Sequence, residues 1–181
     1  MEYILSKEQL NEARKSTRFY SSLNESKVAL ERRAFSYEVT VFLSHHHGDG
    51  TVLENVISEL KRLGVNVYVD WNDTGMPART SGMTATRIKD KIRTCKKFIL
   101  LATEAAIASK WCNWELGYGD ASRFPNDIAI MPIKESGDKN FSGSEYLQIY
   151  PIITNECQYI LGTYYVLYQG TKISLKDWLL R

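Results

Sequence analysis

Short apolar runs alternate with segments of helical period from residue 37 onward. Four runs rich in β-branched and large apolar residues predict strands, at 39–44, 65–69, 98–102 and 128–133. Between the first two runs, apolar side chains return at helical spacing from Leu53 to Leu63, and Gly64 ends that helix. Strands and helices that alternate in this way predict a parallel sheet with helices on both faces.

The rest of the chain is predicted with the same signals. A loop punctuated by glycine and proline spans 70–82, and a second helix follows it through Ile88, Ile92 and Cys95. A third, tryptophan-rich helix is predicted from about Glu104 to Ser122. Residues 134–157 are expected to be rich in loops and 158–168 to be further strand, with a turn at Gly170. Ser174 is then expected to cap a short terminal helix.

The pattern divides the chain into residues 1–36 and residues 37–181. In the first part, Ser6 and Gln9 form a capping box, and 7–33 predicts one or two charged helices. This N-terminal helical arm has two interpretations, a segment that packs on the domain or a contact surface for a partner.

Charge and composition exclude several classes. Residues 1–36 carry a net charge of +2, which leaves the remaining 145 residues neutral and argues against a nucleic-acid partner. No apolar run is long enough to span a bilayer, and the first residues do not read as a secretory signal. Three cysteines without metal-ligand spacing fit a reducing compartment, so we expect a cytoplasmic protein without a membrane partner.

A glutamate set among aromatic residues is the strongest candidate for chemistry. On a helix, Trp111, Trp114, Glu115 and Tyr118 fall on one face, at i, i+3, i+4 and i+7. A carboxylate on such a face must meet water, a partner or a substrate. Two rings beside it suit a flat cationic ligand. The alternative is an amphipathic helix whose aromatic rings fill the core.

Other motifs give no support for a different chemistry. The consecutive histidines His45, His46 and His47 invite a metal site, but consecutive side chains on a strand or loop diverge, so we expect no metal. The glycine patterns of dinucleotide-binding and P-loop proteins are absent, and so is the GxSxG motif. Cys112 lies beside no obvious base in the sequence.

Several segments together resemble Toll/interleukin receptor (TIR) domains. Residues 37–45 followed by Asp49 are similar to the family's opening motif. Residues 67–71 are similar to its second strand and the start of its BB loop. Residues 109–118 are similar to the helix that holds the catalytic glutamate of NAD-cleaving TIR domains. The resemblance runs from 37 to 133, and 145–151 is similar to a segment of a bacterial TIR-like subgroup.

The resemblance implies a flavodoxin-like three-layer sandwich with a central parallel sheet. The pattern along the chain adds an N-terminal helical arm and a C-terminal strand and helix extension. The resemblance implies that Glu115 is catalytic. The residues that it assigns to substrate binding are Ser44, His45, Asp49, Trp71, Asp73 and Trp111. The BB loop, here 71–82, is expected to gate the pocket and to mediate self-association. Its sequence departs from the acidic-proline pattern of animal adaptor domains, which favours the bacterial enzymes.

The implied activity is that of an NAD nucleosidase or ADP-ribosyl cyclase. NAD is then a substrate, and no cofactor is expected. The product would be ADP-ribose or a cyclic isomer that acts as a signal in anti-phage defence, sensed by a downstream effector. Two alternatives stay open: a non-catalytic adaptor that acts by self-association, and an enzyme similar to nucleoside deoxyribosyltransferases.

Overall fold

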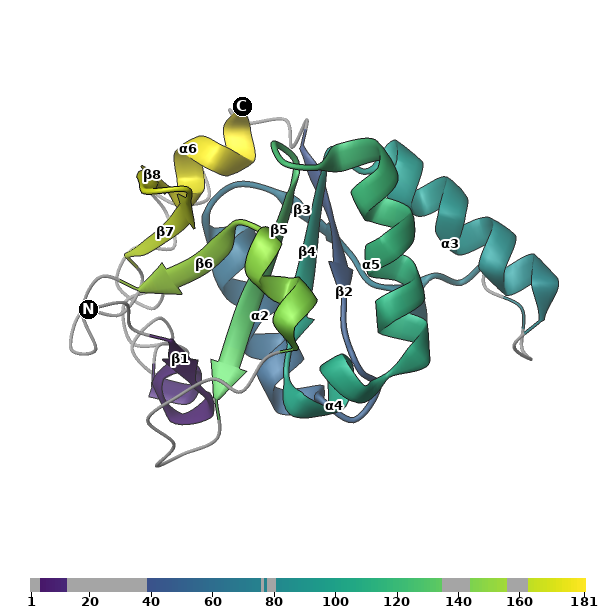
Figure 1. The fold of residues 1–181 in the computed structure, drawn as a ribbon. Helices are drawn as coiled ribbons and strands as arrows, with labels where there is room; N and C mark the ends of the chain where they lie inside the picture. The colour runs from purple at the N-terminus through teal and green to yellow at the C-terminus, as the bar shows by residue number, and fades with distance from the viewer. Residues whose placement is uncertain (1–3, 13–38, 76, 78–80, 135–143, 156–162) are drawn as a thin grey trace.

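The fold is built around one mixed sheet (Figure 1). A computed structural model describes residues 4–12, 39–75, 77, 81–134, 144–155 and 163–181. Within them the strands are β1 (Leu5–Ser6), β2 (Thr40–Ser44), β3 (Asn66–Tyr68), β4 (Lys97–Ala102), β5 (Ile128–Lys134), β6 (Ile152–Asn155), β7 (Tyr164–Tyr168) and β8 (Thr171–Ser174). The helices are α2 (Gly50–Arg62), α3 (Gly82–Thr94), α4 (Glu104–Ala108), α5 (Lys110–Arg123) and α6 (Leu175–Leu180), with 3-10 turns η1 (Asp70–Asn72) and η2 (Glu145–Ile149).

The central strands are parallel, as predicted. Along the sheet the order is β3-β2-β4-β5-β6-β7-β8, and every pair from β3 to β6 runs parallel. Strands β7 and β8 continue the sheet in antiparallel pairs. The order of the five parallel strands is that of a flavodoxin-like sheet, which confirms the predicted fold class.

One of the five central parallel strands was not predicted. β6 lies within 134–157, which the sequence analysis assigned to loops, and it pairs with β5 through Ile152 and Ile130. Its sequence offers only two apolar residues, Ile152 and Ile153, directly after a proline. So short a run carries too weak a local signal, and the strand is stabilised by its neighbours on both sides.

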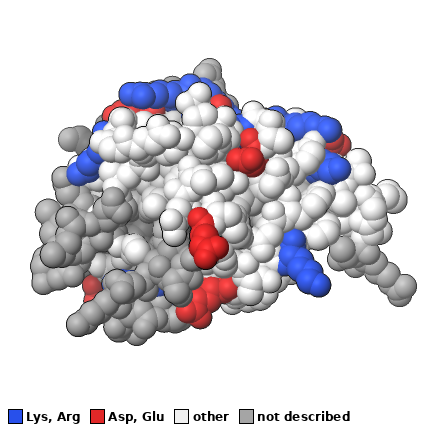
Figure 2. Space-filling view, viewed as in Figure 1, with Lys and Arg blue, Asp and Glu red and all other residues white. Residues whose placement is uncertain are grey.

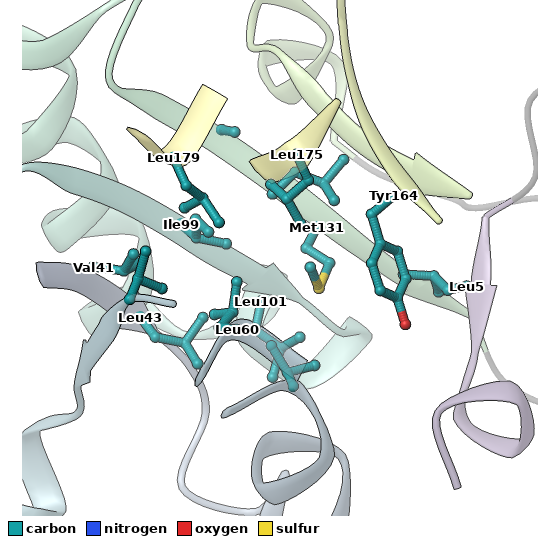
Figure 3. Close-up of a cluster of buried hydrophobic side chains, with 14 of the residues drawn as sticks. Leu5, Val41, Leu43, Leu60, Ile99, Leu101, Met131, Tyr164, Leu175 and Leu179 are labelled. Carbon is teal, nitrogen blue, oxygen red and sulfur yellow. The ribbon is translucent and has the colours of Figure 1, made fainter. Parts of the chain in front are cut away.

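Helices cover both faces of the sheet and create two hydrophobic cores. α2 and α6 contribute to the core on one face, part of which is drawn in Figure 3. α3, α4 and α5 contribute to the core on the other face. Strand β4 lies at the centre and is buried along its whole length, with alternate residues pointing into the two cores.

The tryptophan-rich helix is interrupted where the sequence analysis predicted continuity. Ser109 has extended backbone angles between α4 and α5, and its hydroxyl accepts a hydrogen bond of 3.3 Å from the backbone N–H of Cys112. Serine in this position is a common N-cap. The prediction of one helix was wrong because the apolar period continues through the cap. The break lets α5 start in a new direction, with Glu115 in its second turn.

The first residues of the described chain belong to the sheet. β1 pairs with β5 through Leu5 and Ile133, and residues 7–12 are helical. The predicted capping box is confirmed, since the backbone N–H groups of Ser6 and Gln9 donate to each other's side chains at 2.9 and 3.3 Å. Leu10 is buried in the first core. The rest of the predicted N-terminal arm lies outside the described residues.

The surface seen in Figure 2 carries charges of both signs. Acidic and basic side chains lie interspersed among uncharged ones on this face, which agrees with the balanced composition. Within the described part of the chain, no helix has the length and apolarity required to cross a membrane.

Candidate active site

Glu115 and Ser44 meet at the carboxyl end of the central strands. Ser44 is the last residue of β2, and its hydroxyl donates a hydrogen bond of 2.6 Å to the Oε2 atom of Glu115 on α5. Both side chains are buried, with Glu115 only 3% exposed. Ser44, which the resemblance assigns to substrate binding, therefore lies directly against the carboxyl of Glu115. Ligands of parallel α/β sheets bind at this edge.

Burial controls the ionisation of Glu115. Removing the carboxyl from water raises its pKa from 4.5 to about 8, and the negative charge of Asp70 contributes in the same direction. Hydrogen bonds from Ser44 and from the Trp111 side chain oppose this rise because they stabilise the charged form. The indole N–H is the only donor that a tryptophan side chain has. A carboxyl group that titrates near neutral pH is a mark of a functional site.

Asp49 holds the segment after β2 in place. Its Oδ2 atom accepts hydrogen bonds from the backbone N–H of His46 at 3.1 Å and from the hydroxyl of Thr103 at 3.0 Å. Thr103 in turn caps α4 by accepting from the backbone N–H of Ala106. Asp49 is itself buried. In this structure its carboxylate therefore braces two loops of the site against each other.

His45 follows Ser44 directly and is the first residue of the same loop. Its side chain is buried, its Nδ1 atom lies 3.1 Å from the backbone oxygen of Leu43, and burial lowers its pKa. The backbone oxygen of His45 accepts a bond of 3.2 Å from the thiol of Cys112. Burial raises the pKa of that thiol to about 11, so Cys112 supports the loop and is no nucleophile near neutral pH.

The aromatic residues of α5 contact two different parts of the structure. Trp111 lies next to Glu115, as predicted. Trp114 and Tyr118 instead pack against α3, where the ammonium of Lys89 lies 5.7 and 5.2 Å from their ring centroids. For Trp114 and Tyr118 the structure supports the alternative interpretation, in which the aromatic rings of the helix serve packing. One ring, not two, is left beside the carboxylate.

Comparison with known proteins identifies the family of this chain. A family model described as "TIR domain" matches residues 41–153. The chain belongs to the TIR domain family. This assignment confirms the resemblance inferred from the motifs at the ends of the first two strands and on α5.

Two curated relatives are similar to this TIR domain. One is named "Probable 3' cyclic ADP-D-ribose synthase ThsB'" in Bacillus cereus (strain MSX-D12) and is 31% identical over 141 residues, which is 74% of this chain and 72% of that protein. The other is named "Putative cyclic ADP-D-ribose synthase TIR2" in Cytobacillus dafuensis. It is 30% identical over 81 residues, 43% of this chain and 21% of that protein.

The BB loop of this TIR domain is anchored through Asp73. The Asp73 carboxylate accepts two hydrogen bonds from Arg87 on α3, at 2.6 and 2.9 Å, and one of 2.9 Å from the Tyr68 hydroxyl. The bonds from Arg87 hold the pKa of Asp73 well below its usual range. At Gly75 a β-carbon would lie 2.1 Å from the Arg87 guanidinium, so a larger residue there would displace the Arg87 side chain that holds Asp73.

The two BB-loop residues predicted to bind substrate therefore differ in availability. The Asp73 carboxylate already accepts hydrogen bonds from Arg87 of α3 and from the backbone N–H of Gly75 in the loop. Trp71 is 58% exposed and can contact either a ligand or another protein. Met76 and residues 78–80 of the loop lie outside the described part of the chain.

Two open cavities of about 550 and 580 Å³ lie elsewhere, lined in part by β7 and β8. The first also contacts the amino end of β4, where Lys97 is buried and already paired with Asp127. Ligands of parallel α/β sheets bind at the opposite ends of the strands, so we place the candidate site at Glu115.

Sequence reasoning missed three residues that shape the site. Thr103 was treated only as the end of the third strand, Asp70 only as the start of a loop, and Arg87 not at all. A polar residue directly after a buried parallel strand was the available signal for Thr103 and Asp70. Arg87 gave no signal, because a basic residue on a helix is ordinarily solvated.

The raised pKa of Glu115 predicts a cost in stability that grows with pH. The folded-state pKa of about 8 exceeds the ordinary value of 4.5, so the native state binds the proton more tightly and loses stability as pH rises between these values. Glu115→Gln removes the ionisable group. We expect the variant to exceed wild type by roughly 2–4 kcal/mol in free energy of unfolding at pH 8, and by less than about 1 kcal/mol at pH 5.

Urea denaturation at both pH values measures this difference, and Glu104→Gln, at an exposed glutamate on α4, is the control. A difference between Glu115→Gln and wild type that does not change with pH would show that Glu115 has an ordinary pKa.

Proposed function

We propose that this TIR domain cleaves the N-glycosidic bond between nicotinamide and ribose in NAD, with Glu115 as the catalytic residue. One observation carries the proposal: the buried carboxyl group of Glu115, held by Ser44 and Trp111, lies at the carboxyl edge of a parallel sheet. The names of the two relatives, both cyclic ADP-ribose synthases, support NAD as the substrate.

The chemistry of NAD makes one carboxylate sufficient. Nicotinamide is attached as a pyridinium cation, so when the C–N bond breaks its electron pair neutralises the ring. The leaving group needs no proton. The positive charge moves to the ribose as an oxocarbenium ion, which the carboxylate of Glu115 stabilises. Trp111 orients both partners, since its N–H holds the carboxylate and its ring can contact the flat cation.

The second step decides the product. Water attacks the oxocarbenium ion to give ADP-ribose and a proton. A hydroxyl group of the same molecule attacks to give a cyclic isomer and a proton. We propose the cyclic product on the names of the relatives. A signalling role in anti-phage defence, with an effector that senses the product, stays an expectation from the resemblance.

Glu115→Gln should abolish nicotinamide release from NAD, because the amide keeps the size of the side chain and removes the charge. Chromatography of NAD, nicotinamide and the second product measures the reaction. Trp111→Phe keeps the ring and loses the N–H, so it should reduce kcat less than Trp111→Ala does. Exposed Glu104 serves as the control, and Glu104→Gln should match wild type.

The same assay separates the alternatives. An inactive wild-type chain that still self-associates would support the adaptor reading. Release of a base from deoxynucleosides, without release of nicotinamide from NAD, would support the deoxyribosyltransferase reading. Wild-type turnover in Glu115→Gln would contradict the proposal.

The pH dependence of kcat/KM should follow the ionisation of the Glu115 carboxyl. The carboxylate is the active form, so kcat/KM should rise with pH and level off above the pKa of about 8. Ser44→Ala removes a hydroxyl that favours the charged form, so the acid limb should move to higher pH. The limb of kcat should lie lower than that of kcat/KM, because the bound cation stabilises the carboxylate. An acid limb that Ser44→Ala leaves in place would show that another group is being titrated.

We further propose that the BB loop mediates self-association and that activity depends on it. Trp71 on the loop and Met83 directly after it are 58% and 73% exposed, the highest exposed fractions among the large apolar side chains that the structure describes. Specific activity should therefore rise with protein concentration. Met83→Asp should depress this rise without loss of thermal stability, since the carboxylate lies in the first turn of α3, where the helix dipole favours it.

Lys176→Asp is the matched control for Met83→Asp. It places a carboxylate at the same position of α6, which lies toward the other end of the sheet from α4 (Figure 1). A dilution series of wild type and both variants, followed by nicotinamide release, tests the proposal. Constant specific activity in all three chains would show that one protomer holds a complete site.

A further inference from the structure

His45, His47 and Asp70 form a cluster beside the hydrogen bonds that hold Glu115. Each residue offers one ligand atom, and the three atoms all lie within 4.8 Å of one another. The two histidines follow β2, and Asp70 follows β3 at the start of η1. Because β2 and β3 are parallel neighbours, their ends bring these segments to the same edge of the sheet.

The hydrogen bonds of His45 define which ring nitrogen is available. Its Nδ1 atom lies 3.1 Å from the backbone oxygen of Leu43, and a carbonyl oxygen can only accept. Nδ1 therefore carries the proton, and in the neutral ring Nε2 presents a lone pair. This Nε2 atom is buried and has no hydrogen-bond partner among the described residues.

The lone pair of His45 faces another acceptor. The Oδ1 atom of Asp70 lies 3.7 Å from His45 Nε2, too far for a hydrogen bond. The ring of His47 stacks on that of His45, with centroids 6.0 Å apart, and brings further ring nitrogens to the same place. Acceptor atoms that converge in this way repel one another unless a proton or a metal cation lies between them.

We propose that His45, His47 and Asp70 bind a divalent transition-metal ion of the zinc class. Two imidazole nitrogens and one carboxylate oxygen are a donor set that Zn²⁺ accepts. The bond from His45 Nδ1 to a backbone carbonyl is the outer contact that orients most metal-binding histidines. His47 is exposed, which gives the ion a path from solvent, and a fourth position is left for water or a ligand oxygen.

His46 does not belong to this site. Its Nδ1 atom accepts a hydrogen bond of 3.0 Å from the backbone N–H of Gly48. The side chain of His46 thus diverges from its neighbours, as expected. The expectation did not consider that His45 and His47, two residues apart, return to the same side, or that Asp70 after the neighbouring strand supplies a carboxylate. All three histidines of the chain lie in this segment, so each histidine ligand can be tested singly.

Zn²⁺ titration calorimetry of the metal-free full chain, without NAD, tests the site. Cys95 and Cys112 are buried and their thiol pKa values are raised to about 11, which makes them poor competitors. Cys157 lies outside the described residues and is replaced by serine throughout. We expect wild type to bind a single ion. His47→Phe, which keeps a ring to stack on His45, should bind it roughly tenfold more weakly or worse.

Two further variants sharpen the experiment. Asp70→Asn keeps an oxygen for the 2.8 Å bond from the Trp71 backbone N–H, yet should lose affinity as His47→Phe does. His46→Asn keeps an acceptor for Gly48 and should bind like wild type. Co²⁺ absorption gives a second readout, since four-coordinate nitrogen and oxygen ligation produces visible bands that the two ligand variants should lose.

Absence of Zn²⁺ binding in wild type would overturn the proposal. Unchanged affinity in both ligand variants, or an equal loss in His46→Asn, would overturn it as well. Circular dichroism and thermal melting confirm that each variant is folded before titration. Because no NAD is present, the result does not depend on the proposed catalytic function.

Discussion

The burial of the Glu115 carboxyl between β2 and α5 is the constraint on which the site depends. A carboxyl group with 3% exposure is costly to ionise, and the hydrogen bond from Ser44 offsets only part of that cost. Gly119, one turn after Glu115, lets α5 lie close to Phe98 of β4, where a β-carbon would come within 3.1 Å of the ring. That close approach fixes the height of the carboxyl above the sheet.

The loop after β2 is held by contacts to two other elements, so the site behaves as one unit. Asp49 joins this loop to the end of β4 through Thr103, and the Cys112 thiol joins it to α5 through the backbone oxygen of His45. Ser44 lies at the base of the same loop. A change in any of these bonds would therefore shift the hydroxyl that faces Glu115 and, through it, the pKa of the carboxyl.

The sequence predicted those features that repeat locally. Periodicity located the strands from β2 to β5 and the helices α2 and α3, because each buries apolar residues in a regular pattern, but it did not separate α4 from α5. β6 was missed because a strand of four residues depends on its neighbours more than on its own sequence. In the site, the contact between Ser44 and Glu115 follows from topology, because β2 ends at the edge of the sheet that α5 covers. The diversion of Trp114 and Tyr118 to α3 was not predicted, since helical spacing says which residues share a face but not what that face meets.

Helix α3 connects the BB loop to the helix that carries Glu115. In its middle, Arg87 holds the loop through two bonds to Asp73, and further along the helix Lys89 and Arg93 lie over the aromatic rings of α5. At its end, the backbone oxygen of Ile92 accepts from the Arg123 guanidinium of α5. A contact that displaces the loop thus acts on α3, and α3 is fastened to α5 at both ends of their interface. Self-association through the loop and chemistry at Glu115 would then share one mechanical element, although no residue of the loop need touch the substrate.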